Sequence, residues 1–328
     1  IRDRAYEAMR KNAFESPADE KDYLDGMGRR ALRSYLKYGY IPLEDGVPDA
    51  FHVKEQVSRT LEYAYDDFVL AQVARLLQKE EDYKVLSARA RNYRHVIDPQ
   101  TGYAQGRHAD GTFLKEQNAF QFTKFITEGA PCHYTWYVPH DPYGLMECMG
   151  GRDNFVQKLD SMFSEHRYWH GNEPCHQVAF MFNYAGEPWK TQQAVRHIME
   201  TEYLNAPGGL SGNDDAGQMS AWYIFASLGF YPVCPGSPFY VLASPSFPKA
   251  VLHLENGKSF ILQAENASEE NIYIQKVTLN GKAYTKNYIS HKDIIAGGEM
   301  VFTMGNTPNK TWGNTPEDCP PSLIEVAE

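Results

Sequence analysis

Two adjacent carboxylates stand out among the residues of this chain that could do chemistry. Residues 212–223 read GNDDAGQMSAWY and place Asp214 next to Asp215. Like charges repel, so such a pair is costly unless it holds a metal, caps a helix or moves a proton. A cap for a helix that begins near Ala216 would satisfy free N–H groups with one aspartate. A cap alone explains at most half of the pattern, so the three roles stay open.

A second segment, HGNEPCH at residues 170–176, combines imidazole, amide and carboxylate groups. The pattern is neither an HExxH helix nor a Cys/His pair with structural spacing, so it does not favour zinc. A hard cation bound by side-chain oxygens of Asn172 and Glu173, with backbone carbonyls and water completing the shell, fits better. The alternative is that Glu173 caps a helix that begins near Pro174, because proline is favoured at the first helical position.

The third segment, TEGAPCHYTWYVPHD at residues 127–141, places Glu128 beside a dense group of aromatic residues. Aromatic walls would desolvate this carboxyl group, raise its pKa and keep it protonated, as a general acid requires. A salt bridge with a basic residue is the alternative for Glu128. Trp136 fits either a sugar-stacking platform or the core.

Together these carboxylates suggest hydrolysis of a glycosidic bond. One carboxylic acid protonates the leaving oxygen, and a carboxylate activates water when the two groups are roughly 6.5–9.5 Å apart. Glu128 with Asp215 or Asp214 is a candidate pair.

The elements that must position these loops are mostly helices. Helical periodicity indicates helices at 58–77, 82–97, 150–163, 176–185, 189–204 and 216–229, with the unusual residues on the loops between them. After residue 232, β-forming residues alternate with the turn signals ENG, LNG and AGG, which predicts an antiparallel β unit. We therefore expect a helical domain at residues 1–235 and a β unit at 236–328.

Composition excludes several classes of function. The chain has 328 residues, of which 42% are hydrophobic, so it can bury a large core. A net charge of -10 and dispersed basic residues argue against a nucleic-acid partner. No apolar run is long enough for a membrane span, and no signal peptide is visible. The five cysteines lack CxxC spacing and are expected to be free, mostly buried thiols. Because Ile1 is the first residue, we expect a fragment or a processed chain.

Several long motifs, in order along the chain, resemble glycoside hydrolase family 92. They are TLEYAYDDF (60–68), TEGAPCHYTWYVPHD (127–141), HGNEPCHQVAFMFNYAGEPWKTQ (170–192), GLSGNDDAGQMSAWYIFASLGFYPVCPG (209–236) and MGNTPNKTWG (304–313). The resemblance implies a calcium-dependent, inverting exo-α-mannosidase that acts on mannose-containing oligosaccharides and has an (α/α)6 toroid as its catalytic domain. It also implies a partner domain, an N-terminal β-sandwich absent here, so residues 1–235 would be an incomplete catalytic domain. Periplasmic, secreted or cell-surface bacterial localisation is expected on the same basis.

The resemblance also implies roles for individual residues. Glu128 in TEG would be the general acid, and the general base would lie in GNDD, with Asp215 favoured over Asp214. Asn172 and Glu173 would bind calcium, although Glu173 could instead contact a leaving-group hydroxyl. The residues predicted to bind substrate are Trp136, His170, Glu173 and His176. The family usually continues Glu-Gly-Asn and then Ala-Trp-Gln-Tyr, whereas Glu128-Gly129 is followed here by Ala-Pro-Cys-His-Tyr.

Calcium would have a chemical purpose in such an enzyme. A cation that binds O2 and O3 of mannose could flatten the ring toward the oxocarbenium-like transition state. Two alternatives remain. One is another inverting (α/α)6 activity, such as a glucosidase or a phosphorylase, in which phosphate attacks and no base is needed. The other is a carbohydrate-binding fragment without activity, for which keeping three acids at one cleft would be costly.

Overall fold

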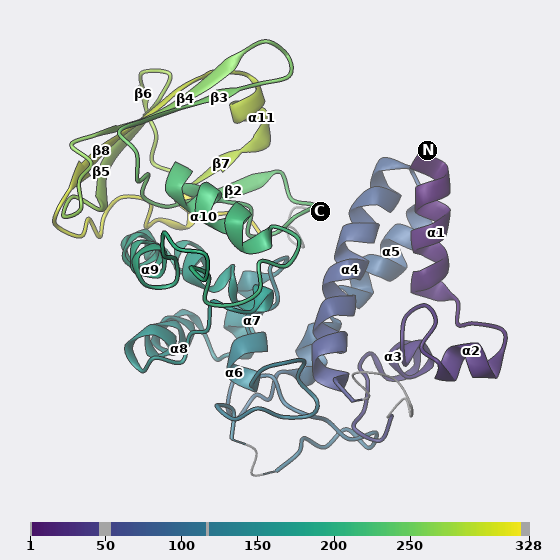
Figure 1. Ribbon diagram of the computed structural model, residues 1–328. Coiled ribbons are helices and arrows are strands. Elements are labelled where there is room, and N and C mark those ends of the chain that lie inside the picture. Colours follow the sequence, from purple (N-terminus) through teal and green to yellow (C-terminus); the bar gives the residue numbers. More distant parts are fainter. Residues whose placement is uncertain (1, 46–53, 116–117, 323–328) are drawn as a thin grey trace. The chain divides into compact units, whose positions relative to one another are not determined.

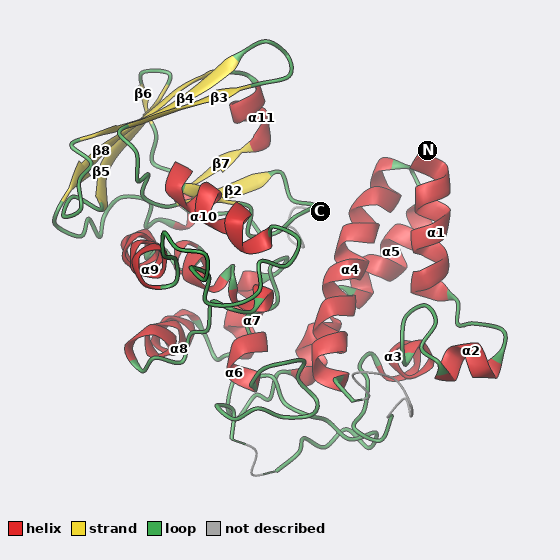
Figure 2. Cartoon of the chain, in the orientation of Figure 1, coloured by secondary structure: helices red, strands yellow, loops and turns green. Residues whose placement is uncertain are grey.

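The computed structural model describes residues 2–45, 54–115 and 118–322. These residues form two compact units, Ile1–Gly151 and Arg152–Glu328. Helices carry most of the chain as far as α10, and strands dominate after it (Figures 1 and 2). The predicted fold class, mainly α with a C-terminal β unit, is confirmed at this level.

The first unit is helical. Its elements are α1 (Arg2–Phe14), α2 (Glu20–Leu24), α3 (Leu32–Tyr38), α4 (Gln56–Leu76), α5 (Glu80–Arg89), the 3-10 helix η1 (Asn92–Val96), α6 (Pro131–Tyr134) and α7 (Pro142–Cys148). The long helix α4 contacts α1, α5 and η1. It therefore forms the centre on which the other helices pack.

A buried carboxylate holds three of these helices together. Asp67 of α4 is fully buried, and its oxygens accept hydrogen bonds from Arg29 Nη1 at 2.6 Å and from Arg89 Nε of α5 at 2.7 Å. The Tyr35 hydroxyl of α3 donates a third at 3.1 Å. Removing one partner of a buried ion pair strongly destabilises the folded protein, because the other charge is left buried without compensation. This cluster therefore fixes how α3, α4 and α5 pack.

The second unit begins with helices and continues into two sheets. Its helices are α8 (Arg152–Ser164), η2 (Glu173–Cys175), η3 (Val178–Asn183), α9 (Pro188–Thr201), α10 (Gln218–Leu228), α11 (His291–Ile295) and η4 (Pro316–Asp318). Its strands are β1 (Phe230–Tyr231), β2 (Phe239–Leu242), β3 (Lys249–His253), β4 (Ser259–Glu265), β5 (Tyr273–Leu279), β6 (Lys282–Ala283), β7 (Tyr288–Ser290) and β8 (Gly298–Gly305).

The strands form a three-stranded sheet, β1-β2-β7, and a five-stranded sheet, β3-β4-β8-β5-β6. The first is antiparallel throughout. The second differs from the predicted antiparallel unit because β4 and β8 pair in parallel. The chain can make this pairing because β5, β6, β7 and α11 lie between β4 and β8 in sequence, and a parallel pair needs such a long connection.

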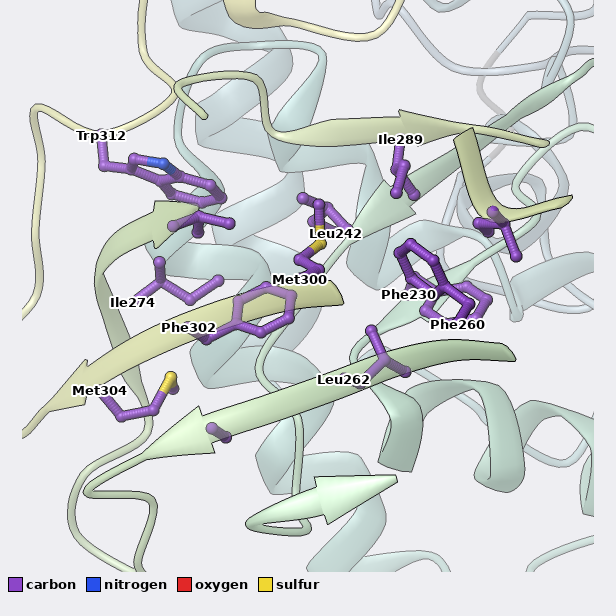
Figure 3. Packing of buried hydrophobic residues seen from close by; sticks show 13 residues of the cluster. Phe230, Leu242, Phe260, Leu262, Ile274, Ile289, Met300, Phe302, Met304 and Trp312 are labelled. Atoms are coloured by element: carbon purple, nitrogen blue, oxygen red, sulfur yellow. The ribbon is translucent and has the colours of Figure 1, made fainter. Parts of the chain in front are cut away.

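The β unit has its own apolar core, shown in Figure 3. Alternate residues of the central strands point into it, including Phe260 and Leu262 of β4 and Met300 and Phe302 of β8. This period of two is the pattern of a sheet that buries one face.

Buried amides join the helices of the second unit to its strands. Asn183 at the end of η3 donates to the carbonyls of Leu242 and Asn287, and Asn287 donates back to the carbonyl of Asn183. Gln192 of α9 accepts the backbone N–H of Ile274 at 2.9 Å. The predicted division near residue 235 therefore marks the change from helices to strands, while the packing of this chain divides at residues 151 and 152.

Most predicted helices are present with shifted ends. The segment predicted at 82–97 is broken into α5 and η1, and the segment predicted at 176–185 is a 3-10 helix, η3.

The five cysteines are free, four of them buried, as predicted. Across residues 2–45, 54–115 and 118–322, no helix is both long enough and apolar enough to cross a membrane.

A buried histidine makes the stability of the first unit depend on pH. The ring of His140 stacks on Phe68 with centroids 5.4 Å apart, and its Nε2 donates to the carbonyl of Ala90 at 2.8 Å. Burial lowers the pKa of His140 to about 4, against the opposing effect of that hydrogen bond. Below pH 6.5 an unfolded histidine binds a proton that the folded one does not, so folding is weakened as the pH falls from about 6.5 to about 4.

We predict that His140→Phe, which keeps the ring but cannot titrate, flattens the pH dependence of the unfolding free energy. The slope of the unfolding free energy against pH should be smaller in the variant than in the wild type by up to about 1.4 kcal/mol per pH unit over this window, since that is the effect of one proton. Urea unfolding followed at pH 7, 6 and 5 measures it. His253→Phe, at an exposed position of β3, is the control. Equal slopes for the wild type and His140→Phe would contradict the prediction.

Candidate active site

The predicted site residues are divided between the two units. Glu128 and Trp136 belong to the first unit, and all the others belong to the second.

In the second unit, two loops meet backbone to backbone at a pair of glycines. A Cβ on Gly212 would lie 2.4 Å from the carbonyl oxygen of Gly171, and a Cβ on Gly171 would lie 2.9 Å from the carbonyl oxygen of Ser211. Real Cβ atoms do not approach backbone this closely, so both positions need glycine. The structure thus brings the HGNEP and SGNDD segments, predicted separately, against each other.

Asp214 has a structural role. Its Oδ1 accepts hydrogen bonds from the backbone N–H of Ser220 at 3.0 Å and from the Ser220 hydroxyl at 2.9 Å. Ser220 lies in the first turn of α10, where N–H groups have no partner within the helix. One carboxylate of the pair therefore caps this helix, as one of the three predicted roles required.

Asp215 differs from its neighbour. Both carboxylates are exposed, but among the described residues no hydrogen bond holds that of Asp215. Its backbone is left-handed, with φ 47°, and Ala216 and Gly217 follow with φ 56° and 93°. Residues other than glycine rarely adopt this conformation, and at functional sites such strain of about 1–3 kcal/mol per residue is retained for a purpose. The turn leaves Asp215 available for proton transfer.

Next to Gly171, the buried side chain of His170 is fixed in one neutral tautomer. Tyr203 donates its single hydroxyl proton to the carbonyl of Met219 at 2.9 Å, so it must accept from His170 Nε2, 2.6 Å away. His170 Nδ1 then accepts from the Tyr168 hydroxyl at 2.7 Å. The ring of Trp222 packs on His170 with centroids 4.4 Å apart.

His176 makes a second chain of hydrogen bonds that reaches the GNDD turn. Its Nε2 donates to the carbonyl of His170 at 3.1 Å, so its Nδ1 is an acceptor and faces the Gln218 amide nitrogen at 3.3 Å. The same nitrogen is 3.3 Å from the Tyr231 hydroxyl. Gln218 is the first residue of α10, so these contacts anchor the start of the helix directly after the turn that carries Asp215.

Burial keeps both imidazoles neutral. It lowers the pKa of His170 to about 3, and the neighbouring His176 adds to this effect. It lowers the pKa of His176 to about 4, although the carbonyl of His170 and the charge of Asp215 oppose the change. Neutral rings donate and accept one hydrogen bond each, as the two chains require.

Asn172 and Glu173 lie at the start of the 3-10 helix η2, with Asn172 buried at the N-cap position and Pro174 following Glu173. Oxygen donors of this kind suit a hard cation such as calcium. In the described parts of the chain, however, no group of three or more His, Cys, Asp or Glu residues could hold a metal ion. A cation here would therefore depend on backbone carbonyls, water and a ligand for most of its shell.

In the first unit, Glu128 lies on an exposed turn just before α6. Its backbone is left-handed, with φ 48°. The turn is held on one side by the Thr127 N–H, which donates to Ser58 Oγ at 2.7 Å, and on the other by the Ala130 N–H, which donates to His133 Nδ1 at 3.1 Å. The side chain of Glu128 is exposed, so the predicted desolvation by aromatic walls is not seen in this structure.

Three residues predicted to bind substrate are instead core residues. Trp136 and His170 are 0% exposed and His176 is 1% exposed, so none can lie against a sugar ring in this structure. Trp136 packs in the first unit, and both histidines hold the loops of the second. Their effect on a bound ligand would therefore be indirect, through the segments that they position.

The sequence analysis missed the residues that hold the loops in place. Tyr168, Tyr203, Gln218 and Ser220 complete the hydrogen bonds described above. Ser220, six residues after Asp214, could have been recognised as a capping partner in a first turn. The tyrosines lie far from the motif in sequence and carry no local signal.

A family model described as the glycosyl hydrolase family 92 catalytic domain matches residues 1–306 of the chain. Among solved structures, the family GH92 alpha-mannosidase BT3965 from Bacteroides thetaiotaomicron is 40% identical with a TM-score of 0.88, and the match covers 98% of this chain and 42% of that one. The family GH92 inverting mannosidase BT2199 from Bacteroides thetaiotaomicron VPI-5482 is 36% identical with a TM-score of 0.89, covering 98% and 46%.

An uncharacterized secreted glycosidase from Arthroderma benhamiae is 30% identical over 353 residues, covering 98% of this chain and 44% of that protein. The chain thus spans less than half the length of each of these relatives. The TM-scores show that it shares the fold of the two family 92 structures, which confirms the predicted fold class.

The contact between the glycines gives a test of how the two loops are held. We predict that Gly212→Ala destabilises the second unit by about 1–3 kcal/mol, because the added methyl group must push the backbone of Gly171 away. Gly208→Ala is the matched control in the same region, since its Cβ would have nothing within 4 Å. Urea unfolding of both variants gives the free energies. Equal stability of the two variants would mean that the loops do not depend on this contact.

Proposed function

Because this chain belongs to glycosyl hydrolase family 92, we propose that it is the catalytic part of an inverting exo-α-mannosidase that removes terminal α-linked mannose from oligosaccharides. Both solved relatives described above are mannosidases by name, and one is named as inverting. The observation that carries the proposal is the division of roles between adjacent aspartates. Both carboxylates are exposed, but Asp214 is held by Ser220, whereas Asp215 lies on a strained turn and has no hydrogen bond among the described residues.

In the proposed reaction Asp215 is the general base and Glu128 is the general acid. Asp215 takes a proton from water, whose oxygen forms a bond with the anomeric carbon as the bond to the leaving oxygen breaks. Glu128 gives its proton to that oxygen. One displacement occurs, so the configuration at the anomeric carbon is inverted and no covalent intermediate forms.

The neighbouring residues support these roles. The hydrogen bonds of Ser220 hold Asp214, and the Gln218 amide anchors the helix that follows the turn, so Asp215 has a fixed backbone. Glu128 is fixed in the same way by the bonds of Thr127 and Ala130. Positioned groups contribute about 10²–10⁴-fold to proton transfer.

We also propose that calcium takes part, bound through Asn172 and Glu173. The donor set supports it: an amide and a carboxylate with backbone carbonyls nearby are hard oxygen ligands. When bound, calcium would polarise the mannose hydroxyls and favour a flattened ring.

Like the Arthroderma benhamiae relative, which is named as secreted, the protein would work outside the cell or at its surface. A further domain in the longer protein would complete the binding cleft, since relatives extend well beyond the part matched here.

Substitutions of the three acids test the assignment. We predict that Asp215→Asn lowers kcat on α-linked mannobiose by about 10²–10⁴-fold, because the base is lost. Asp214→Asn should lower kcat less than Asp215→Asn does, because the Asn oxygen still accepts from Ser220.

Glu128→Gln should abolish hydrolysis of mannobiose but retain more activity on an aryl mannoside with a good leaving group, which needs little protonation. Equal losses of Glu128→Gln on both substrates would exclude the acid role, and a larger loss in Asp214→Asn would exchange the aspartates.

Removal of divalent ions tests the proposed cofactor. We expect excess EDTA to stop mannose release from α-1,2-mannobiose and calcium to restore it, with β-mannose as the first anomer seen by proton NMR. Calcium should also raise the melting temperature of the wild type and not that of an Asn172→Ala, Glu173→Gln double variant, because a ligand that binds only the native state stabilises it. Full activity in EDTA would exclude calcium, and α-mannose as the first product would exclude inversion.

A further inference from the structure

A short loop of the first unit exposes two phenyl rings next to the turn of Glu128. Phe120 is 40% exposed and Phe122 is 67% exposed, and they are separated by one residue. Single exposed apolar residues are common, but two on one loop beside a candidate catalytic group form a surface that calls for an explanation. Neither ring entered the sequence analysis.

The exposure does not come from a loosely held backbone. The carbonyl of Ala119 accepts the Cys132 N–H of α6 at 2.9 Å, and the carbonyl of Lys124 accepts the Glu55 N–H before α4 at 2.9 Å. These bonds fix the loop before and after the two rings. The rings of Phe120 and Tyr103 also pack in a T-shaped arrangement, with centroids 5.5 Å apart. The loop is therefore built to hold its phenyl rings at the surface.

His133 connects this surface to the proposed acid. The Phe122 ring packs edge to face on His133, with centroids 6.2 Å apart and an interplanar angle of 79°. His133 Nδ1 in turn accepts the N–H of Ala130, and a Cβ on Gly129 would lie 3.3 Å from that nitrogen. Phe122 and the turn at Glu128 and Gly129 thus adjoin the same imidazole ring.

The chemistry of a general acid indicates what could lie on this surface. The acid donates to the oxygen of the leaving group, so the leaving group must lie on the side of Glu128. When that group is a sugar, its ring has an apolar face of C–H bonds. An exposed aromatic ring offers a large rigid surface for such a face at little cost in side-chain entropy.

We propose that Phe122, with Phe120 beside it, forms a binding site for the sugar ring on the leaving side of the cleaved bond. This inference rests on the proposed function and extends it. It means that the protein binds a pyranose ring beyond the terminal mannose, and that oligosaccharides are better substrates than mannosides with a small leaving group. The mannose on the other side of the bond makes no contact with these rings.

Two substrates separate this site from the chemistry of the acid and base. An α-linked mannobiose places a sugar on the leaving side, whereas α-mannosyl fluoride leaves that side empty. Phe122→Ala should raise KM for mannobiose by about tenfold, the effect of one lost stacking contact of about 1.4 kcal/mol. It should leave kcat/KM for the fluoride within twofold. Phe122→Tyr should restore KM for mannobiose, because the ring face is restored.

Phe247→Ala is the matched control, because Phe247 is 53% exposed in the second unit, just before β3. It should change neither substrate. Equal effects of Phe122→Ala on both substrates, or no effect on mannobiose, would overturn the proposal. A melting temperature for each variant shows that the fold is intact.

Failure of the proposed function would be seen separately, as a wild type that cleaves neither substrate. Titration calorimetry of mannobiose then still tests the site. Binding weakened by Phe122→Ala and restored by Phe122→Tyr supports it, and equal or absent binding in the wild type and Phe122→Ala overturns it.

Discussion

The approach of Gly171 to Gly212 is the constraint on which the rest of the candidate site in the second unit depends. Two loops whose contacting glycines are 41 residues apart in sequence can share one place only because neither has a side chain at the point of contact. Asn172 and Glu173 follow the first glycine, and Asp214 and Asp215 follow the second. A close contact of two backbones is rigid, because no rotamer change can relieve it. Acidic and amide groups that would repel or drift apart on flexible loops are thereby held in one region.

The buried histidines extend this rigidity into the core. Their low pKa values follow from burial, and neutrality is what lets each ring donate with one nitrogen and accept with the other. A protonated His170 would point a second donor, Nδ1–H, at the Tyr168 hydroxyl that donates to this nitrogen in the neutral ring. Predicted as ligand-binding residues, they act one layer deeper, where imidazole serves as a polar bridge between loops and helix α10. Histidine types and spacing led to the prediction of direct ligand contact, but both rings are buried in this structure.

Sequence reasoning performed best where the pattern is local. Periodicity located α4, α8, α9 and α10 to within a few residues, and the alternation of β4 and β8 follows from their burial of one face. It did less well where partners are distant. The parallel pairing of β4 with β8 depends on a long connection. Residues 178–183 contact α8 and α9 and form a 3-10 helix, which periodicity did not distinguish from an α-helix. The Glu128, Asn172–Glu173 and Asp214–Asp215 segments were recognisable because each places several chemical groups on one loop. The roles of Tyr203 and Gln218 were not, since they arise only when α10 folds onto the histidines.

Both proposed catalytic carboxylates lie in the same unusual backbone conformation, and this links stability to function. Glu128 and Asp215 have φ near 48° and 47°, where a side chain costs free energy that glycine would avoid. A glycine follows Glu128 directly and follows Asp215 two residues later, so the chain could place glycine at either turn but places an acid. In each case hydrogen bonds from adjacent residues hold the turn: Thr127 and Ala130 for one, Ser220 and Gln218 for the other. Regular helices could carry these acids without strain, but the direction of a side chain on a helix is fixed by the orientation of that helix. A strained turn at the start of a helix lets the helix keep its packing while the acid takes a direction of its own, and the surrounding hydrogen bonds stabilise the turn against the cost of that conformation.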